Sequence, residues 1–443
     1  MKFINYYHTF NDNQKTFFAI SAGTLIGFIT SIIITRSLGP SGRGEYAVIM
    51  SLLSIMMAFS QFGIPEAMLF QAGKKINNLC GLAINNFLFI PLVSLLTGTL
   101  FVIAYLFIEL PFLENVGAHL IKIVFMILPF SLTILLFNRI NQLNSKLNIY
   151  NSLNFINHLL FLVIVVTFLL FQSINPGTIL IAFLVSKIIL AFITVIITLK
   201  SLDIANYRID FSLLKESIVN GSRVHWGMII YTIGMYGDIF IINYFLKIED
   251  VGYYSLAIGL GSYLKIVPEV FRTVLQSLMP KLSDKNDSSV KNTVIATRYV
   301  IIIMVILYIL IISFGFSFIK IVYGVAFTKA YVPLLIIVVG IIFQSIGQII
   351  VSQLTIDGYL SFTSIAASLG AIIGLILAWF FIPLWGLYGA AFSLVANHFF
   401  AVCLYGFYLN KKNNVNIIDL LPTFVELKEF YSSLSFFFKR KQN

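Results

Sequence analysis

The sequence predicts an all-α integral membrane protein, and three observations support this prediction. Of the 443 residues, 59% are hydrophobic and only 11% are charged, whereas soluble domains carry about 25% charged residues. The apolar runs are about 20 residues long, the length that a helix needs to cross the hydrocarbon core. They also lack the alternation of barrel strands. Because lipid offers the backbone no hydrogen bonds, spans of this length must be helices.

Twelve apolar runs predict about twelve transmembrane helices. Prolines lie inside or at the ends of several of them, and a proline kinks a helix because it removes a backbone hydrogen bond. The segment after the last run mixes apolar residues with charges, which favours an interfacial helix over a thirteenth span. The predicted spans are 16–35, 46–64, 84–108, 120–137, 152–171, 177–199, 223–246, 253–279, 294–319, 332–354, 360–382 and 386–409.

Three weak sequence matches indicate an internal repeat with an offset of about 208 residues. Six spans per repeat leave both halves in the same orientation, so two pseudo-symmetric six-helix lobes are expected. The predicted divisions are an N-terminal lobe 1–199, a cytoplasmic linker 200–222, a C-terminal lobe 223–409 and a basic interfacial tail 410–443. The matching pairs are Leu38–Tyr46 with Leu246–Tyr254, Leu147–Phe155 with Leu354–Phe362, and Gly177–Phe183 with Gly386–Phe392.

The net charge of +11 lies mainly in short loops and in the tail. If the N-terminus is cytoplasmic, basic positions such as Lys74, Lys75, Lys411 and Lys412 face the cytoplasm, as the positive-inside rule requires. Both termini are therefore expected in the cytoplasm. This distribution disfavours nucleic acid as a partner. The two cysteines lie far apart and show no metal or disulfide spacing, and no cofactor is expected.

Charged residues inside apolar helices are the informative positions, because each costs about 2.5–3.5 kcal/mol at the bilayer centre. In the span 253–279, Lys265, Glu269 and Arg272 fall on one helical face. Glu269 can pair with either cation. The group is then either an internal ion pair with one spare cation or the wall of a cationic cavity that contains one carboxylate.

Three further charged residues lie in or next to other spans. Asp238 has no cation one turn away, so it either pairs with another helix or is a protonatable group. Glu66 follows Pro65 at the cytoplasmic end of a span, where an interfacial residue is also plausible. Lys187 is the one basic residue in its span, which favours a cavity or a partner over snorkelling.

The sequence carries no recognised catalytic motif. The stretch GPSGRGE at Gly39–Glu45 looks like a phosphate loop but lacks the Lys-Ser/Thr ending and joins two spans, so a turn is expected. There is no HExxH, GxSxG or DxD pattern, and no long loop that would hold an active site. The chain is therefore expected not to be an enzyme.

Two segments carry a family resemblance: SLGPSGRGEYAVIMSLLSIMMAFSQFGIP at Ser37–Pro65 and DIFIINYFLKIEDVGYYSLA at Asp238–Ala257. Through them the chain resembles Wzx-type polysaccharide lipid flippases of the multidrug/oligosaccharidyl-lipid/polysaccharide exporter superfamily. The resemblance covers about residues 15–410 and implies a MATE-like fold with a central cavity between two lobes. It places six charged residues on cavity-lining helices, namely Arg36, Glu66, Asp238, Lys265, Glu269 and Arg272.

The resemblance implies a transporter of the bacterial inner membrane that flips undecaprenyl-diphosphate-linked oligosaccharides to the outer leaflet for O-antigen, capsule or exopolysaccharide synthesis. A small-molecule or multidrug exporter of the same fold is the alternative. It would need an acidic cavity, which the positive balance of the span 253–279 disfavours. Membrane lipids and polymerase machinery are the other expected partners. The expected substrate-binding cations are Lys265, Arg272, Lys187 and Arg36.

No ATP-binding motif is present, so an ion gradient is the expected energy source. Moving one charge through 100 mV provides about 2.3 kcal/mol. The coupling group would bind H⁺ or Na⁺, and a carboxylate suits both. Glu269 is the first candidate because its cationic neighbours would compete with a diphosphate, and Asp238 and Glu66 are the alternatives. If these groups are only structural, the supply of substrate alone drives transport.

Overall fold

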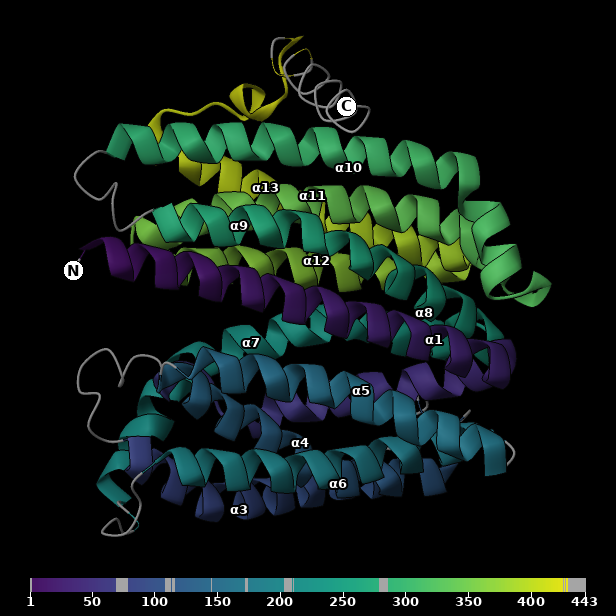
Figure 1. Cartoon of the computed structure of the whole chain (residues 1–443). Helices are drawn as coiled ribbons and strands as arrows, with labels where there is room; N and C mark the ends of the chain where they lie inside the picture. The colour runs from purple at the N-terminus through teal and green to yellow at the C-terminus, as the bar shows by residue number, and fades with distance from the viewer. Residues whose placement is uncertain are drawn as a thin grey trace, which may run out of the picture. The chain divides into compact units, whose positions relative to one another are not determined.

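The computed structural model describes residues 2–68, 79–107, 113, 116–144, 146–171, 174–202, 209, 211–278, 286–424, 426 and 428. Regular structure in this part of the chain is entirely helical (Figure 1). Ten of its helices are long and apolar enough to cross a membrane. Large apolar side chains face outward on them, for example Leu95 and Leu384, which are 74% and 72% exposed. Such surfaces are stable only in lipid, so the chain is a multi-pass membrane protein.

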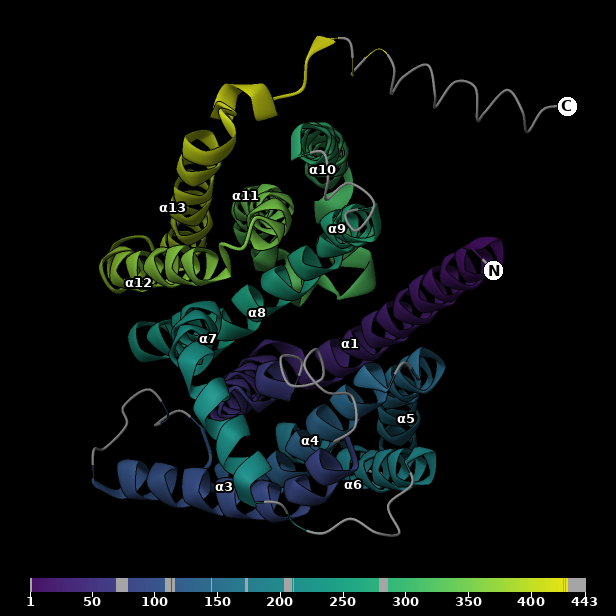
Figure 2. The ribbon, with the colours of Figure 1, turned by 90° about the vertical axis from the view of Figure 1, so that its left-hand side faces the viewer.

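The chain divides into two compact units, Met1–Gly252 and Tyr253–Asn443. The predicted lobe boundaries at residues 199, 223 and 409 remain predictions. In the first unit, α4 packs on α6, α5 packs on both of them, and α1 packs on α5 and α7 (Figure 2). Its helices are α1 (Lys2–Ser60), α3 (Leu79–Phe107), α4 (Ala118–Leu143), α5 (Leu147–Phe171), α6 (Pro176–Ser201) and α7 (Phe211–Phe245).

The second unit is built around α11 and α13, which pack on each other and on α10 and α12 respectively. The helix α8 (Ile248–Ser262) starts in the first unit and continues into the second. The other elements are η3 (Tyr263–Lys265), α9 (Ile266–Leu278), α10 (Asn286–Val322), η5 (Val325–Ala330), α11 (Tyr331–Ile356), α12 (Leu360–Trp385), α13 (Leu387–Asn413) and η6 (Ile417–Leu420).

Two of the predicted spans form one continuous element, α1. Its apolar part runs over 42 residues, Ala19–Ser60, about twice the length that crosses a bilayer. The helix is interrupted at Gly39, whose φ of 65° and ψ of −178° are not helical, and Pro40 follows it. A positive φ suits glycine because it has no Cβ. The break separates the predicted spans 16–35 and 46–64.

The predicted span 253–279 is also broken. It is built from α8, one 3₁₀ turn at η3 and then α9, with Pro268 in the first turn of α9. Proline is tolerated in a first helical turn, where its missing N–H has no partner to lose. With α1 counted as two spans and α8–α9 as one, the described helices agree with the predicted count of about twelve.

Candidate functional site

The candidate site is a pocket of about 340 Å³ in the first unit, lined by residues of α1, α4, α5 and α6. It contains two cations, Lys187 and Arg139, and no carboxylate. The rest of its lining combines amides and hydroxyls with aliphatic side chains: Met57, Ser131, Ile134, Leu135, Asn138, Gln142, Tyr150 and Asn154. The chemistry of the pocket is therefore cationic and rich in hydrogen-bonding groups.

Lys187 lies near the middle of α6. This helix starts with a capping box, in which the Thr178 backbone N–H donates to Asn175 Oδ1 over 2.9 Å, and Pro176 is pre-set for the first turn. The Lys187 ammonium donates to Asn157 Oδ1 of α5 over 2.8 Å and lies 4.6 Å from the centre of the Phe183 ring. In the described part of the chain it has no carboxylate within ion-pair distance. Lys187 thus has an amide and an aromatic ring as partners, and it also lines the pocket.

Arg139 is the second cation of the pocket, near the end of α4. Its guanidinium donates to Gln142 Oε1 over 2.7 Å and forms an ion pair with Glu66 at 3.7 Å between Nη2 and Oε1. The other oxygen of Glu66 is buried and has no hydrogen-bond partner. Burial raises the pKa of Glu66, while a backbone hydrogen bond and Arg139 oppose the rise. Glu66 is therefore a partly buried carboxyl group next to a pocket cation.

Amide side chains connect the helices around the pocket. Asn138 of α4 donates to Asn154 of α5 over 3.1 Å, and Asn141 of α4 donates to Thr198 of α6 over 2.8 Å. In an apolar bundle these bonds fix the rotation of each helix, because an unsatisfied buried amide would cost free energy. The two bonds connect α4 to α5 and to α6.

In the second unit, Glu269 pairs with Arg272 and not with Lys265. The Arg272 guanidinium binds Glu269 through two bonds, Nη2 to Oε1 at 2.5 Å and Nε to Oε2 at 3.0 Å. Lys265 is the last residue of the 3₁₀ turn before α9, and it forms no ion pair among the described residues. The bidentate pair neutralises Arg272, a predicted phosphate ligand.

Lys265 is the cation of this segment that keeps its charge available. No described carboxylate lies within ion-pair distance of it. Its ammonium interacts electrostatically with His398 of α13, which is buried at 6% exposure. Lys265 therefore combines a half-buried position with an unneutralised positive charge.

The remaining predicted site residues lie apart from the pocket. Asp238 is buried in α7, with 6% exposure, and its Oδ1 accepts the backbone N–H of Ile239 over 2.8 Å. Arg36 is exposed in α1, three residues before the break at Gly39. Neither residue lines the pocket around Lys187.

Sequence reasoning did not single out Arg139 or the asparagines. A signal was present, because Asn151, Asn154 and Asn157 recur every third residue of an otherwise apolar run. Such spacing places polar groups on one side of a helix. The sequence could not predict that this face contacts Lys187 of α6, since that contact depends on how the helices pack.

The comparison with family models gives a match to polysaccharide biosynthesis protein over residues 14–286. This match covers more than half of the chain. The chain belongs to the polysaccharide biosynthesis protein family. A comparison with curated protein sequences gave no match.

Solved structures share the fold of this family member. It is similar to the lipid II flippase MurJ in an inward closed conformation, with a TM-score of 0.71, 14% identity, and 91% of this chain and 88% of that chain covered. An inward-facing multidrug resistance MATE family transporter of the MOP superfamily gives a TM-score of 0.64 at 13% identity, with 88% and 94% covered. A point mutant of the Vibrio cholerae MATE transporter VcmN gives 0.59 at 13% identity, with 91% and 97% covered. The expected MATE-like fold is confirmed.

Proposed function

We propose that the chain is a flippase, which moves an undecaprenyl-diphosphate-linked oligosaccharide from the cytoplasmic to the outer leaflet of the bacterial inner membrane. The product would supply synthesis of O-antigen, capsule or exopolysaccharide. The observation that supports this most is the pocket around Lys187, whose lining contains two cations and no carboxylate, with one of the cations, Arg139, paired with Glu66 outside the lining. The family description and the MurJ-like fold agree with this proposal.

The substrate explains why these residues are useful. A diphosphate with attached sugars cannot enter hydrocarbon unaided, because burying unpaired charge is prohibitive. Lys187 and Arg139 would offset anionic groups, and the amides of Asn138, Asn154 and Gln142 would replace water around sugar hydroxyls. The lipid tail would stay in the bilayer.

A drug exporter of the same fold is the competing function. Exporters of cationic drugs need carboxylates that face the drug, and the pocket around Lys187 has none among its lining residues. In α9 the carboxylate of Glu269 is already bound by Arg272. The charges thus favour an anionic substrate.

For ion coupling we propose Glu66 in preference to Glu269. Glu66 shares Arg139 with the pocket, so protonation of Glu66 would release Arg139 to bind an anionic substrate. Proton and substrate binding would then be linked, and such linkage is reciprocal. Glu269 is held by two bonds from Arg272, and Asp238 lies outside the pocket.

The test is transport in proteoliposomes that contain a fluorescent undecaprenyl-diphosphate oligosaccharide. We expect Lys187→Ala to lower the flipping rate at least about tenfold, since a charged hydrogen bond contributes about 1.5–3 kcal/mol. Lys200→Ala is the matched control, because Lys200 is exposed at the end of the same helix. Equal rates in wild type and Lys187→Ala, or efflux of cationic dyes by the wild type, would refute the proposal.

A further inference from the structure

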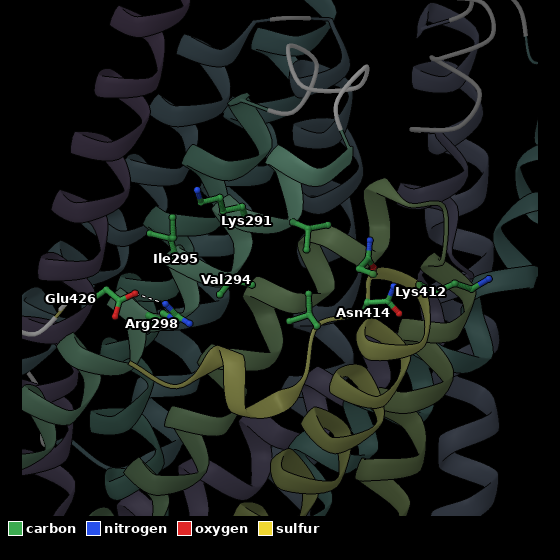
Figure 3. A pocket seen from close by; sticks show the side chains of 10 residues that line it. Lys291, Val294, Ile295, Arg298, Lys412, Asn414 and Glu426 are labelled. Carbon is green, nitrogen blue, oxygen red and sulfur yellow. Dashed lines mark hydrogen bonds and ion pairs between the residues drawn. The ribbon is translucent and has the colours of Figure 1, made fainter. Parts of the chain in front are cut away.

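A second pocket, of about 720 Å³, lies in the second unit between the start of α10 and the end of α13 (Figure 3). Its wall on α10 is formed by Val290, Val294 and Ile295, and Val415 adds an apolar group from the chain after α13. Polar groups lie at its ends. The pocket therefore offers an apolar surface beside charged rims.

Three cations and one carboxylate line this pocket. Lys291 and Arg298 lie two turns apart on α10, about 10 Å along the helix axis, and Lys412 lies in the last turn of α13. Glu426 is the one acidic residue among the lining residues. Lys412 also lies over the rings of Tyr359 and Tyr408, which holds it at the rim. The balance of charge in the pocket is positive.

Arg298 attaches the C-terminal segment to α10. Its Nε donates to the carbonyl oxygen of Asp419 over 2.9 Å, and its Nη1 binds the carboxylate of Glu426. The Thr423 hydroxyl, and then Arg298, lower the pKa of Glu426 to about 2, although burial opposes the shift. Glu426 is thus a fixed negative charge on the segment that closes one end of the pocket.

The pocket lies where a lipid headgroup would be. The uninterrupted apolar run of α10 begins at Tyr299, directly after Arg298, and Lys411 and Lys412 lie in the last turn of α13. Basic residues at the ends of transmembrane helices mark the interface with anionic lipid. The cations of the pocket therefore lie on the headgroup side of the apolar run.

We propose that this pocket binds the phosphate headgroup of an anionic membrane lipid, with Lys291 and Arg298 at the phosphate and the acyl chains in the bilayer beside α10. The pocket shares no residue with the one around Lys187, so the proposal does not depend on the transport function. Glu426 competes for Arg298, and lipid binding would loosen the C-terminal segment.

The test is a titration of the purified full-length chain in detergent, followed by native mass spectrometry. The probes are phosphatidylglycerol, phosphatidylcholine and inorganic phosphate. One charge near an anionic headgroup is worth about fivefold in affinity. We expect Lys291→Gln to weaken phosphatidylglycerol binding about fivefold, and Lys291→Gln with Arg298→Gln about twenty-fivefold. Glu426→Gln should strengthen it about fivefold.

Lys320→Gln is the matched control, because Lys320 is an exposed lysine in the last turn of the same helix. It should leave the affinity unchanged. Replacing Arg298 could disturb the C-terminal segment that it binds. Lys291 is exposed and does not bind that segment, so Lys291→Gln alone still tests the proposal. Equal binding of phosphatidylcholine, or inorganic phosphate as strong as the lipid, would overturn the assignment. So would equal effects of Lys291→Gln and Lys320→Gln.

Discussion

Gly44, which follows the break in α1, and Gly252, in the first turns of α8, lie where the two helices pack against each other. A Cβ on Gly44 would lie 1.9 Å from the carbonyl oxygen of Ile248, and a Cβ on Gly252 would lie 2.0 Å from the carbonyl oxygen of Pro40. Gly252 follows Gly44 by 208 residues and Ile248 follows Pro40 by 208, the offset of about 208 residues that the internal repeat predicts. Each helix is therefore packed against the backbone of its repeat-related counterpart.

The first prediction concerns this contact. Gly44→Ala and Gly252→Ala should each lower stability by about 1–3 kcal/mol, because the added methyl group would overlap backbone that cannot rotate away. Gly98→Ala is the control, since its Cβ would meet the Phe125 ring at an ordinary 3.4 Å. Thermal unfolding in detergent measures the difference. Equal melting temperatures for the three variants would contradict the prediction.

The second prediction is a pH dependence that comes from Glu66. Burial raises its pKa, so the neutral form is favoured in the folded chain. Its contribution to stability is therefore largest below the unfolded pKa of about 4.3 and is lost as the pH rises through the higher folded value. Glu66→Gln should remove this dependence. Melting temperatures of both forms measured across that range check it, and parallel curves would show that Glu66 does not titrate there.

The transport rate should also depend on the protonation of Glu66. If protonation of Glu66 releases Arg139, Glu66→Gln should flip substrate at a rate that ignores an imposed pH gradient. Arg139→Gln should bind substrate more weakly, since it removes one of the two pocket cations. A gradient response in Glu66→Gln equal to that of the wild type would remove Glu66 from the coupling role.

The third prediction separates stability from function at Lys187. Its ammonium has an amide and a ring as partners, and a lysine at mid-bilayer costs about 2.5–3.5 kcal/mol on insertion. Lys187→Met keeps the length of the side chain and removes the charge. It should raise the melting temperature and abolish transport. A lower melting temperature would mean that Lys187 stabilises the bundle.

The fourth prediction ranks the cations of the second unit. Arg272 is neutralised by Glu269 and the pair is about 40% exposed, so the pair contributes about 0–1 kcal/mol to stability. Lys265 has no described carboxylate within ion-pair distance. Lys265→Gln should therefore reduce transport more than Arg272→Gln does. The reverse order, in variants with equal membrane levels, would favour Arg272 as the substrate ligand.

The sequence by itself determined the features that depend on local patterns. Apolar runs of bilayer length predicted about twelve helices, and glycine and proline marked the breaks in α1 and between α8 and α9. Both signals are one-dimensional, because a span needs length and apolarity, and a break needs one permissive or one rigid residue. The family resemblance rested on the same stretches of sequence.

Only the tertiary structure decided which charged groups meet. Glu66 pairs with Arg139 of α4, Lys187 donates to Asn157 of α5, and Glu269 pairs with Arg272 of its own helix. Such pairings depend on the rotation and packing of each helix about its axis. Helical spacing cannot supply that information, since it fixes which residues share a face but leaves open which neighbour that face meets.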